Sequence, residues 1–156
     1  MPIKASKPIP DGIQSVTPVI NFTGDCAQAI DFYKKAFGAE VVGDIAKAPD
    51  GKVLHAMIKI GDSNVMLSDV MGPAENAAGL RGNLWLYVDN CDSIFNRAAG
   101  AGCKVVWPLI DQFWGDRAGT IIDPFGHQWS IATLKWILTP QEMKEKQAEW
   151  FASLKR

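Results

Sequence analysis

The sequence lacks the features that mark several large functional classes. Lysine and arginine (16 together) almost balance aspartate and glutamate (17), so the formal net charge is -1, and no block of like charge occurs. This balance argues against nucleic acids and membrane surfaces as partners. No apolar run approaches the roughly 18 residues that a membrane span requires. The first residues, MPIKASKPIPDG, also lack the apolar stretch of a signal peptide.

Cysteine is scarce, with only Cys26, Cys91 and Cys103 in the chain. They stand in no metal-binding spacing, and their odd number favours reduced thiols in a cytoplasmic protein. Cys26 and Cys91 each fall near the start of an expected helix, a position that lowers a thiol pKa, but no histidine is adjacent in sequence. A nucleophile elbow, a P-loop and a dinucleotide fingerprint are all missing, so we expect no nucleotide cofactor.

The chain does contain one pattern written twice, in a composition and length that suit a single globular domain. Phe22 matches Tyr87 at an offset of 65 (87 − 22), and Cys26 matches Cys91 at the same offset. After a one-residue slip, the segment 65–67 matches 129–131 at an offset of 64 (129 − 65). A nearly constant offset through helix and strands indicates duplication of one supersecondary unit.

Each copy predicts one strand, one helix and three further strands. Module 1 covers about residues 13–69, a linker covers 70–81, module 2 covers about 82–134, and a C-terminal helix covers about 139–154. The strands are expected at 16–22, 41–45, 53–60 and 64–68 in module 1, and at 82–88, 104–107, 117–123 and 127–133 in module 2.

Helix boundaries are predicted from capping residues. Asp25 is expected to cap the first helix, with Gln28 completing a capping box, and Gly38 is expected to end it in the left-handed conformation. Asp89 or Asn90 is expected to cap the second helix. The segment Thr139-Pro140-Gln141-Glu142 combines a capping box with a proline at the first helical position, so it predicts the start of the last helix.

Alternation along the strands separates an aliphatic face from a mixed one. The aliphatic face, which includes Leu54, Ile58, Leu67 and Ile131, is expected beneath the helices. The other face carries amide, aromatic, thioether and hydroxyl side chains, the composition expected of a small-molecule site. The residues that we predict to bind a ligand on this face are Met57, Met66, Asn83, Trp85, Tyr87, Gln128 and Ser130, with Trp114 and Arg117 at the rim.

Two residues on or near this face leave alternatives open. His55 is the candidate catalytic residue because imidazole titrates near neutrality, but a half-buried structural histidine at the start of a strand is the other interpretation. Arg117 could meet an anionic ligand, or it could pair with Asp116 and shape the loop between them and the preceding strand.

The paired modules, the helix end FYKKAFGAE and the hairpin DPFGHQWSIA resemble the glyoxalase/bleomycin-resistance/dioxygenase (vicinal oxygen chelate) superfamily. The segments VLHAMIKIGDSNVMLSD, DQFWGDR and DPFGH resemble its PhnB-like branch. The resemblance covers about residues 13–145. It implies an α+β fold in which two tandem βαβββ modules, eight strands in all, curl their mixed sheets into facing half-barrels around a cavity. It also implies a homodimer, which the apolar segment 136–138 beside Trp150 and Phe151 favours as well.

Metal-dependent members of this superfamily place four ligands, usually His, Gln or Glu, on the concave face. The resemblance puts those positions on Pro18, Met66, Asn83 and Ser130. A proline side chain has no donor atom, a thioether is a poor ligand for hard or borderline divalent metals, and neutral amide and hydroxyl groups are weak ligands. We therefore expect no metal cofactor, and a metal-independent protein that binds a small molecule. The alternative is a glyoxalase-like lyase, isomerase or other enzyme that uses a rearranged divalent-metal site or His55 as an acid or base.

Overall fold

The computed structural model describes residues 4–6, 8–70 and 83–154, and the chain divides into two compact units. Unit 1 covers Met1–Leu80 and unit 2 covers Arg81–Arg156. Apart from Val70, the predicted linker at 70–81 lies outside the described residues. Within the described ranges, no helix combines the length and the apolar character needed to cross a membrane.

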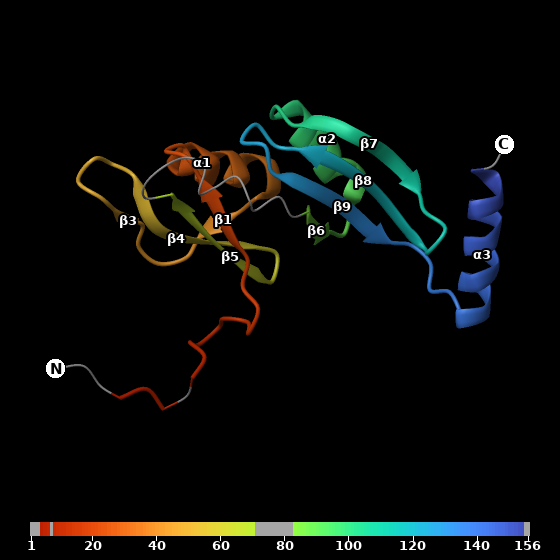
Figure 1. Ribbon diagram of the computed structural model, residues 1–156, viewed down its shortest axis with the longest axis horizontal. Helices are drawn as coiled ribbons and strands as arrows, with labels where there is room; N and C mark the ends of the chain where they lie inside the picture. Colours follow the sequence, from red (N-terminus) through yellow and green to blue (C-terminus); the bar gives the residue numbers. More distant parts are fainter. Residues whose placement is uncertain (1–3, 7, 71–82, 155–156) are drawn as a thin grey trace. The chain divides into compact units, whose positions relative to one another are not determined.

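Unit 1 consists of one helix and a mixed sheet (Figure 1). The sheet has the order β1-β5-β4-β2, and β3 also pairs with β4; β1 and β5 are parallel, and the other pairs are antiparallel. The strand predicted at 41–45 is instead two short strands, because Gly43 between them turns the chain with φ +70°. The elements of unit 1 are β1 (Val19–Phe22), α1 (Cys26–Phe37), β2 (Glu40–Val41), β3 (Ala46–Lys47), β4 (Val53–Ile60) and β5 (Ser63–Asp69).

Unit 2 repeats this arrangement, with the sheet order β6-β9-β8-β7 and a parallel pairing of β6 with β9. The predicted α+β fold of two βαβββ modules is therefore confirmed. Strand β7 runs to Asp111, beyond the predicted end at Trp107, and its register against β8 shifts on both sides of Trp107. The elements of unit 2 are β6 (Asn83–Tyr87), α2 (Cys91–Gly100), β7 (Lys104–Asp111), β8 (Asp116–Ile122), β9 (Gln128–Leu134) and α3 (Pro140–Ser153).

The aliphatic strand face forms the core beneath each helix, as predicted. Ile58, Leu67 and Ile131 are fully buried. Leu54 is the exception, because 48% of its surface is exposed. Ala46 pairs with His55 and Lys47 with Val53, so Leu54 is an extra residue in β4, and Val53 takes the buried position in its place.

The N-terminus of α1 is capped from a distant strand rather than by Asp25. The Asp25 side chain makes no capping bond. Instead, Asp69 at the end of β5 uses Oδ1 to accept hydrogen bonds from the N–H groups of Gly24 (2.8 Å) and Cys26 (3.1 Å). Its Oδ2 accepts from the N–H of Val53 (2.8 Å). The predicted capping box with Gln28 is therefore wrong, whereas the left-handed Gly38 at the C-terminus is confirmed.

Unit 2 uses the equivalent strand position for the same purpose. Thr133, which stands 64 positions after Asp69 (133 − 69), accepts a hydrogen bond from the N–H of Cys91 (2.9 Å) and donates to the carbonyl of Val88 (2.8 Å). Asn90 adds a conventional cap, because its side chain accepts from the N–H of Ser93 (3.1 Å). Capping from the last strand of the module is therefore a shared property of both copies.

The C-terminal helix α3 begins as predicted. Thr139 and Glu142 form a reciprocal capping box, and Pro140 occupies the first turn. The backbone hydrogen bond from Thr139 and the hydroxyl contact lower the pKa of Glu142. Along α3 no residue is buried, but the Trp150 ring lies 5.3 Å from that of Phe113. The helix therefore contacts the loop between β7 and β8 of the same unit through an aromatic pair.

Candidate functional site

The sheet of unit 2 brings five of the predicted ligand-binding residues onto one face. Asn83 pairs with Gln128, and Trp85 pairs with Ser130, in the parallel ladder between β6 and β9. Tyr87 follows two residues after Trp85 and therefore points to the same side. The core residues of β9 alternate with them and face the other way, toward α2.

Ser130 is at the centre of a polar row across this face. The Asn83 side chain donates to Ser130 Oγ (3.0 Å), and Ser130 Oγ also bonds to Thr120 Oγ1 (2.8 Å) on β8. Only 3% of Ser130 is exposed. Its hydroxyl therefore ties three strands together, and its bonding capacity is largely used within the sheet.

Three aromatic rings and a buried carboxylate lie beside this row. Asp116, the first residue of β8, is 2% exposed, and its Oδ2 accepts from Trp114 Nε1 (2.7 Å) and from the Tyr87 hydroxyl (3.0 Å). The Trp85 ring lies 6.0 Å from the Tyr87 ring and 6.3 Å from the Trp114 ring, each at 53°. We call Trp85, Tyr87 and Trp114 the aromatic cluster. The predicted residues thus meet, but around an aspartate that the sequence did not single out as a site residue.

The phenol of Tyr87 is held in its protonated form. Loss of hydration raises the pKa of Tyr87, and the hydrogen bond to Asp116 and the negative charge of its carboxylate raise it further. A hydrogen bond from Trp85 partly offsets this rise. At neutral pH, Tyr87 is therefore a hydrogen-bond donor whose proton is committed to Asp116.

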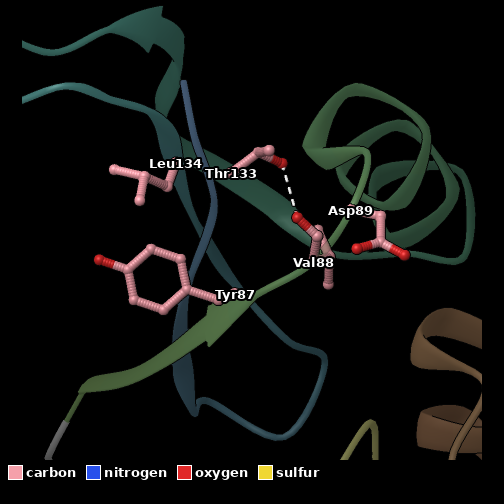
Figure 2. A pocket seen from close by; sticks show the side chains of 5 residues that line it. All are labelled: Tyr87, Val88, Asp89, Thr133 and Leu134. Atoms are coloured by element: carbon pink, nitrogen blue, oxygen red, sulfur yellow. Dashed lines mark hydrogen bonds between the residues drawn. The ribbon is translucent and has the colours of Figure 1, made fainter. Parts of the chain in front are cut away.

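A hollow of about 620 Å³ lies at the end of β6. Figure 2 shows the Tyr87 ring beside Leu134 on one side of the strands, with Asp89 on the side of α2. The Thr133 hydroxyl points to the Val88 carbonyl in the same view. The hollow is lined by Tyr87, Val88, Asp89, Thr133 and Leu134, so one edge of the aromatic cluster borders it.

Arg117 lies on the other side of the sheet from the aromatic cluster. Its guanidinium donates to both oxygens of Asp92 on α2 (3.0–3.2 Å) and to Asp111 (3.3 Å). These hydrogen bonds raise the pKa of Arg117, and the bond from Arg117 lowers the pKa of Asp92. The ion pair considered between Arg117 and Asp116 is therefore wrong, because neighbouring strand residues point to opposite faces.

The predicted site residues of unit 1 form a smaller group. Met57 on β4 and Met66 on β5 are directly opposite each other in the antiparallel ladder. Met57 is buried and Met66 half-buried, whereas His55 is exposed beside the extra residue Leu54. Within the described residues, the His55 side chain forms no hydrogen bond or ion pair, so nothing there orients its imidazole.

The four positions that hold a metal in other superfamily members do not suit a divalent ion in this chain. In unit 1, Pro18 has no ligating side chain, and its carbonyl accepts from the N–H of Met66 (2.9 Å). In unit 2, Asn83 and Ser130 bond to each other. Across the described ranges, no three His, Cys, Asp or Glu side chains are grouped so that they could hold a metal ion. The donor set and its hydrogen bonding therefore do not fit a metal at these positions.

Cys26, at the start of α1, and Cys103, before β7, are not activated nucleophiles. Burial, together with the negative charges of Asp69 and Asp25, raises the pKa of Cys26 to about 12. Burial and the charge of Asp123 raise the pKa of Cys103 to about 12 as well. Cys91 is buried. Since the thiolate is the reactive form, these environments favour a packing role for Cys26 and Cys103.

Comparisons with known proteins agree with this geometry. The family model described as "Glyoxalase/Bleomycin resistance protein/Dioxygenase superfamily" matches residues 15–131. The uncharacterized protein Mb0911c of Mycobacterium bovis is 44% identical over 115 residues, covering 69% of this chain and 75% of that protein.

Solved structures show the same fold. Protein PA1353 of Pseudomonas aeruginosa is 26% identical with a TM-score of 0.65, covering 79% of this chain and 99% of its own. A PhnB protein of Bacillus cereus is 21% identical with a TM-score of 0.60, covering 77% of this chain and 99% of its own. The chain belongs to the glyoxalase/bleomycin resistance protein/dioxygenase superfamily.

Proposed function

We propose that this protein is a metal-independent small-molecule-binding protein, similar to the bleomycin-resistance side of its superfamily. The observation that carries the proposal is the aromatic cluster around Asp116. Of this cluster, Trp85 is 43% exposed and Tyr87 61% exposed. The Tyr87 hydroxyl is nevertheless bonded to Asp116, and the Trp85 ring packs against the rings of Tyr87 and Trp114. Rigid exposed rings beside a few oriented polar groups provide apolar contact area for a ligand at little cost in side-chain entropy.

An enzyme that uses His55 as an acid or base has less support. A general base is normally oriented by a partner that holds its ring in one tautomer. Exposed His55 has no such partner in the part of unit 1 that the structure describes, and its cross-strand neighbour is Ala46. A metal enzyme has less support still, because the four family positions offer a poor donor set.

Replacing Trp85 with alanine is expected to weaken ligand binding more than replacing Ser130 with alanine. A ring that stacks on a ligand contributes about 1–3 kcal/mol or more, whereas one neutral hydrogen bond contributes about 0.5–1.5 kcal/mol. The ligand is first identified by native mass spectrometry of protein from its host or by screening. Calorimetry then compares wild type, Trp85→Ala and Ser130→Ala, with Phe32→Ala on α1 of unit 1 as the aromatic control. Equal affinity in wild type and Trp85→Ala contradicts the proposed site.

Purified protein is expected to carry no stoichiometric divalent metal. The reason is the donor set at Pro18, Met66, Asn83 and Ser130. Elemental analysis after purification without chelators measures this directly. About one Zn, Ni, Fe or Mn per chain that disappears in Met66→Ala or Ser130→Ala contradicts the proposal and favours the enzyme alternative.

We also propose that the protein is a homodimer. Trp136 and Ile137 follow β9 and are largely exposed, Ile137 to 89%. Trp150 and Phe151 on α3 are also exposed, although their rings pack against each other at 5.0 Å. Together these side chains expose more apolar surface than a monomer usually leaves in water. Sedimentation equilibrium is expected to give a dimer, and a Trp136→Ser/Ile137→Ser double variant to shift toward monomer. A strictly monomeric wild type at high concentration contradicts this.

A further inference from the structure

The charge distribution around the aromatic cluster restricts the class of ligand that the proposed site accepts. The Tyr87 hydroxyl and the Trp114 indole N–H both donate to one oxygen of Asp116. These two donors are therefore directed into the protein. What Tyr87 and Trp114 can still present to a ligand is the face of each ring, which carries the negative end of the quadrupole.

Among the residues that the structure describes, no cationic side chain pairs with the carboxylate at the centre of the cluster. Arg117 is the next residue in the chain, but its guanidinium is engaged by Asp92 and Asp111 across the sheet. Within the described residues, the hydrogen bonds of the Asp116 carboxylate come from two uncharged donors. In this part of the chain, electron-rich rings cover the buried negative charge, and no described cation pairs with it.

Such an environment discriminates between ligands by charge. An anion would meet ring faces and a carboxylate of its own sign, so the cluster disfavours it. A neutral ring gains stacking alone. A cation gains both the attraction of the ring faces and the field of Asp116, which is stronger where water is excluded. Ring faces are also the usual recognition surface for quaternary ammonium groups, which have no N–H to donate to a carboxylate.

We propose that the aromatic cluster around Asp116 binds an organic cation, specifically a quaternary or methylated ammonium group. Trp85 and Tyr87 contribute the exposed ring faces, and the hollow beside Tyr87 leaves room for the remainder of the ligand. This inference rests on the proposed small-molecule-binding function and names the ligand class for the same site. Asp116 acts at a distance through its charge, because the rings cover it.

The test compares two molecules of nearly identical shape. Choline carries a trimethylammonium group, and 3,3-dimethylbutan-1-ol replaces the charged nitrogen with carbon. Each molecule is titrated into the protein, and binding is measured by calorimetry and by NMR of the indole N–H resonances. Choline is expected to bind about tenfold or more tightly than the neutral alcohol. In Asp116→Asn, choline affinity is expected to fall about tenfold while binding of the alcohol stays within a factor of about two.

Further variants keep the test decisive if Asp116→Asn does not fold. Tyr87→Phe retains the ring and removes one hydrogen bond to Asp116, so choline affinity is expected to stay within about threefold of wild type. Tyr87→Leu removes the ring, so choline affinity is expected to fall about fivefold or more. Trp85→Ala is expected to lose choline binding as well. Phe32→Ala, which removes a half-buried ring from α1 in unit 1, is the control and is expected to bind choline as wild type does.

The outcomes separate this inference from the proposed function. Equal binding of choline and the neutral alcohol, with both lost in Trp85→Ala, overturns the cation preference and leaves the small-molecule site in place. Choline binding that is unaffected by Trp85→Ala and Tyr87→Leu overturns the assignment to the aromatic cluster. Absence of choline binding at tens of millimolar also overturns the inference. The proposed function is then tested separately, by whether Trp85→Ala weakens binding of the ligand found in the host.

Discussion

Replacing Asp69 with alanine is expected to lower the free energy of unfolding by at least about 3 kcal/mol. The buried carboxylate accepts three backbone hydrogen bonds, from Gly24, Cys26 and Val53, and so connects the start of α1 to the start of β4. Hydrogen bonds to a charged group contribute about 1.5–3 kcal/mol each, and a buried donor left without a partner costs about 1–3 kcal/mol. Urea unfolding followed by circular dichroism measures the change.

Two further variants define the origin of this effect. Asp69→Asn retains one acceptor oxygen and is expected to be intermediate between wild type and Asp69→Ala. Asp62→Ala removes a carboxylate from the exposed turn between β4 and β5 and is expected to change stability by less than about 0.5 kcal/mol. A loss in Asp69→Ala no larger than that in Asp62→Ala shows that the three amides find other partners.

Much of this fold could be predicted because its signals are local or repeated. The spacing between Cys26 and Cys91 anticipates the first residues of both helices, and α1 and α2 begin at these residues. Period-two alternation assigned Ile58, Leu67 and Ile131 to the core because each strand has one helix-covered face. Capping boxes are also local, which is why the start of α3 at Thr139 was predictable.

The errors occur where a distant segment decides a local choice. Asp25 occupies the N-cap position and fits the local pattern, but Asp69, brought close by the parallel pairing of β1 with β5, satisfies the helix N-terminus instead. The orientation of Leu54 depends on how β3 pairs with β4. The extra residue in β4 makes Val53, and not Leu54, point into the core at the start of the strand. Neither outcome has a signal within a few residues of the position concerned.

The candidate site could be predicted in part for the same reason. Alternation was sufficient to place Trp85, Tyr87 and Ser130 on one face, because they lie on paired strands. It could not show that Asp116 would be buried beneath Trp114 and Tyr87, since the Tyr87 contact joins two strands, β6 and β8, at residues 29 positions apart. From the sequence, Asp116 was considered only as a partner for Arg117. Adjacent residues of a strand point to opposite faces, and this alternation was the available signal against that pairing.

A second large effect is expected in unit 2, where replacing Gly119 with alanine should destabilise the fold by about 2 kcal/mol. Gly119 lies on β8 beneath α2. An added Cβ would be 2.7 Å from Phe95 Cε2, 2.9 Å from the Leu109 backbone nitrogen and 3.0 Å from the Trp107 carbonyl oxygen. The Phe95 ring can move, but the two backbone atoms belong to the irregular part of β7 that packs against β8, so the strand itself has to shift.

Gly100→Ala is the matched control, because Gly100 ends α2 with no heavy atom within 4 Å of an added Cβ. Alanine restricts the unfolded chain more than glycine does, so Gly100→Ala is expected to stabilise the protein by about 0.4–1 kcal/mol. The two substitutions add the same methyl group to the same unit, and they should therefore move the urea midpoint in opposite directions. A Gly119→Ala midpoint at or above that of wild type contradicts the close approach of β7 and Phe95 to this strand.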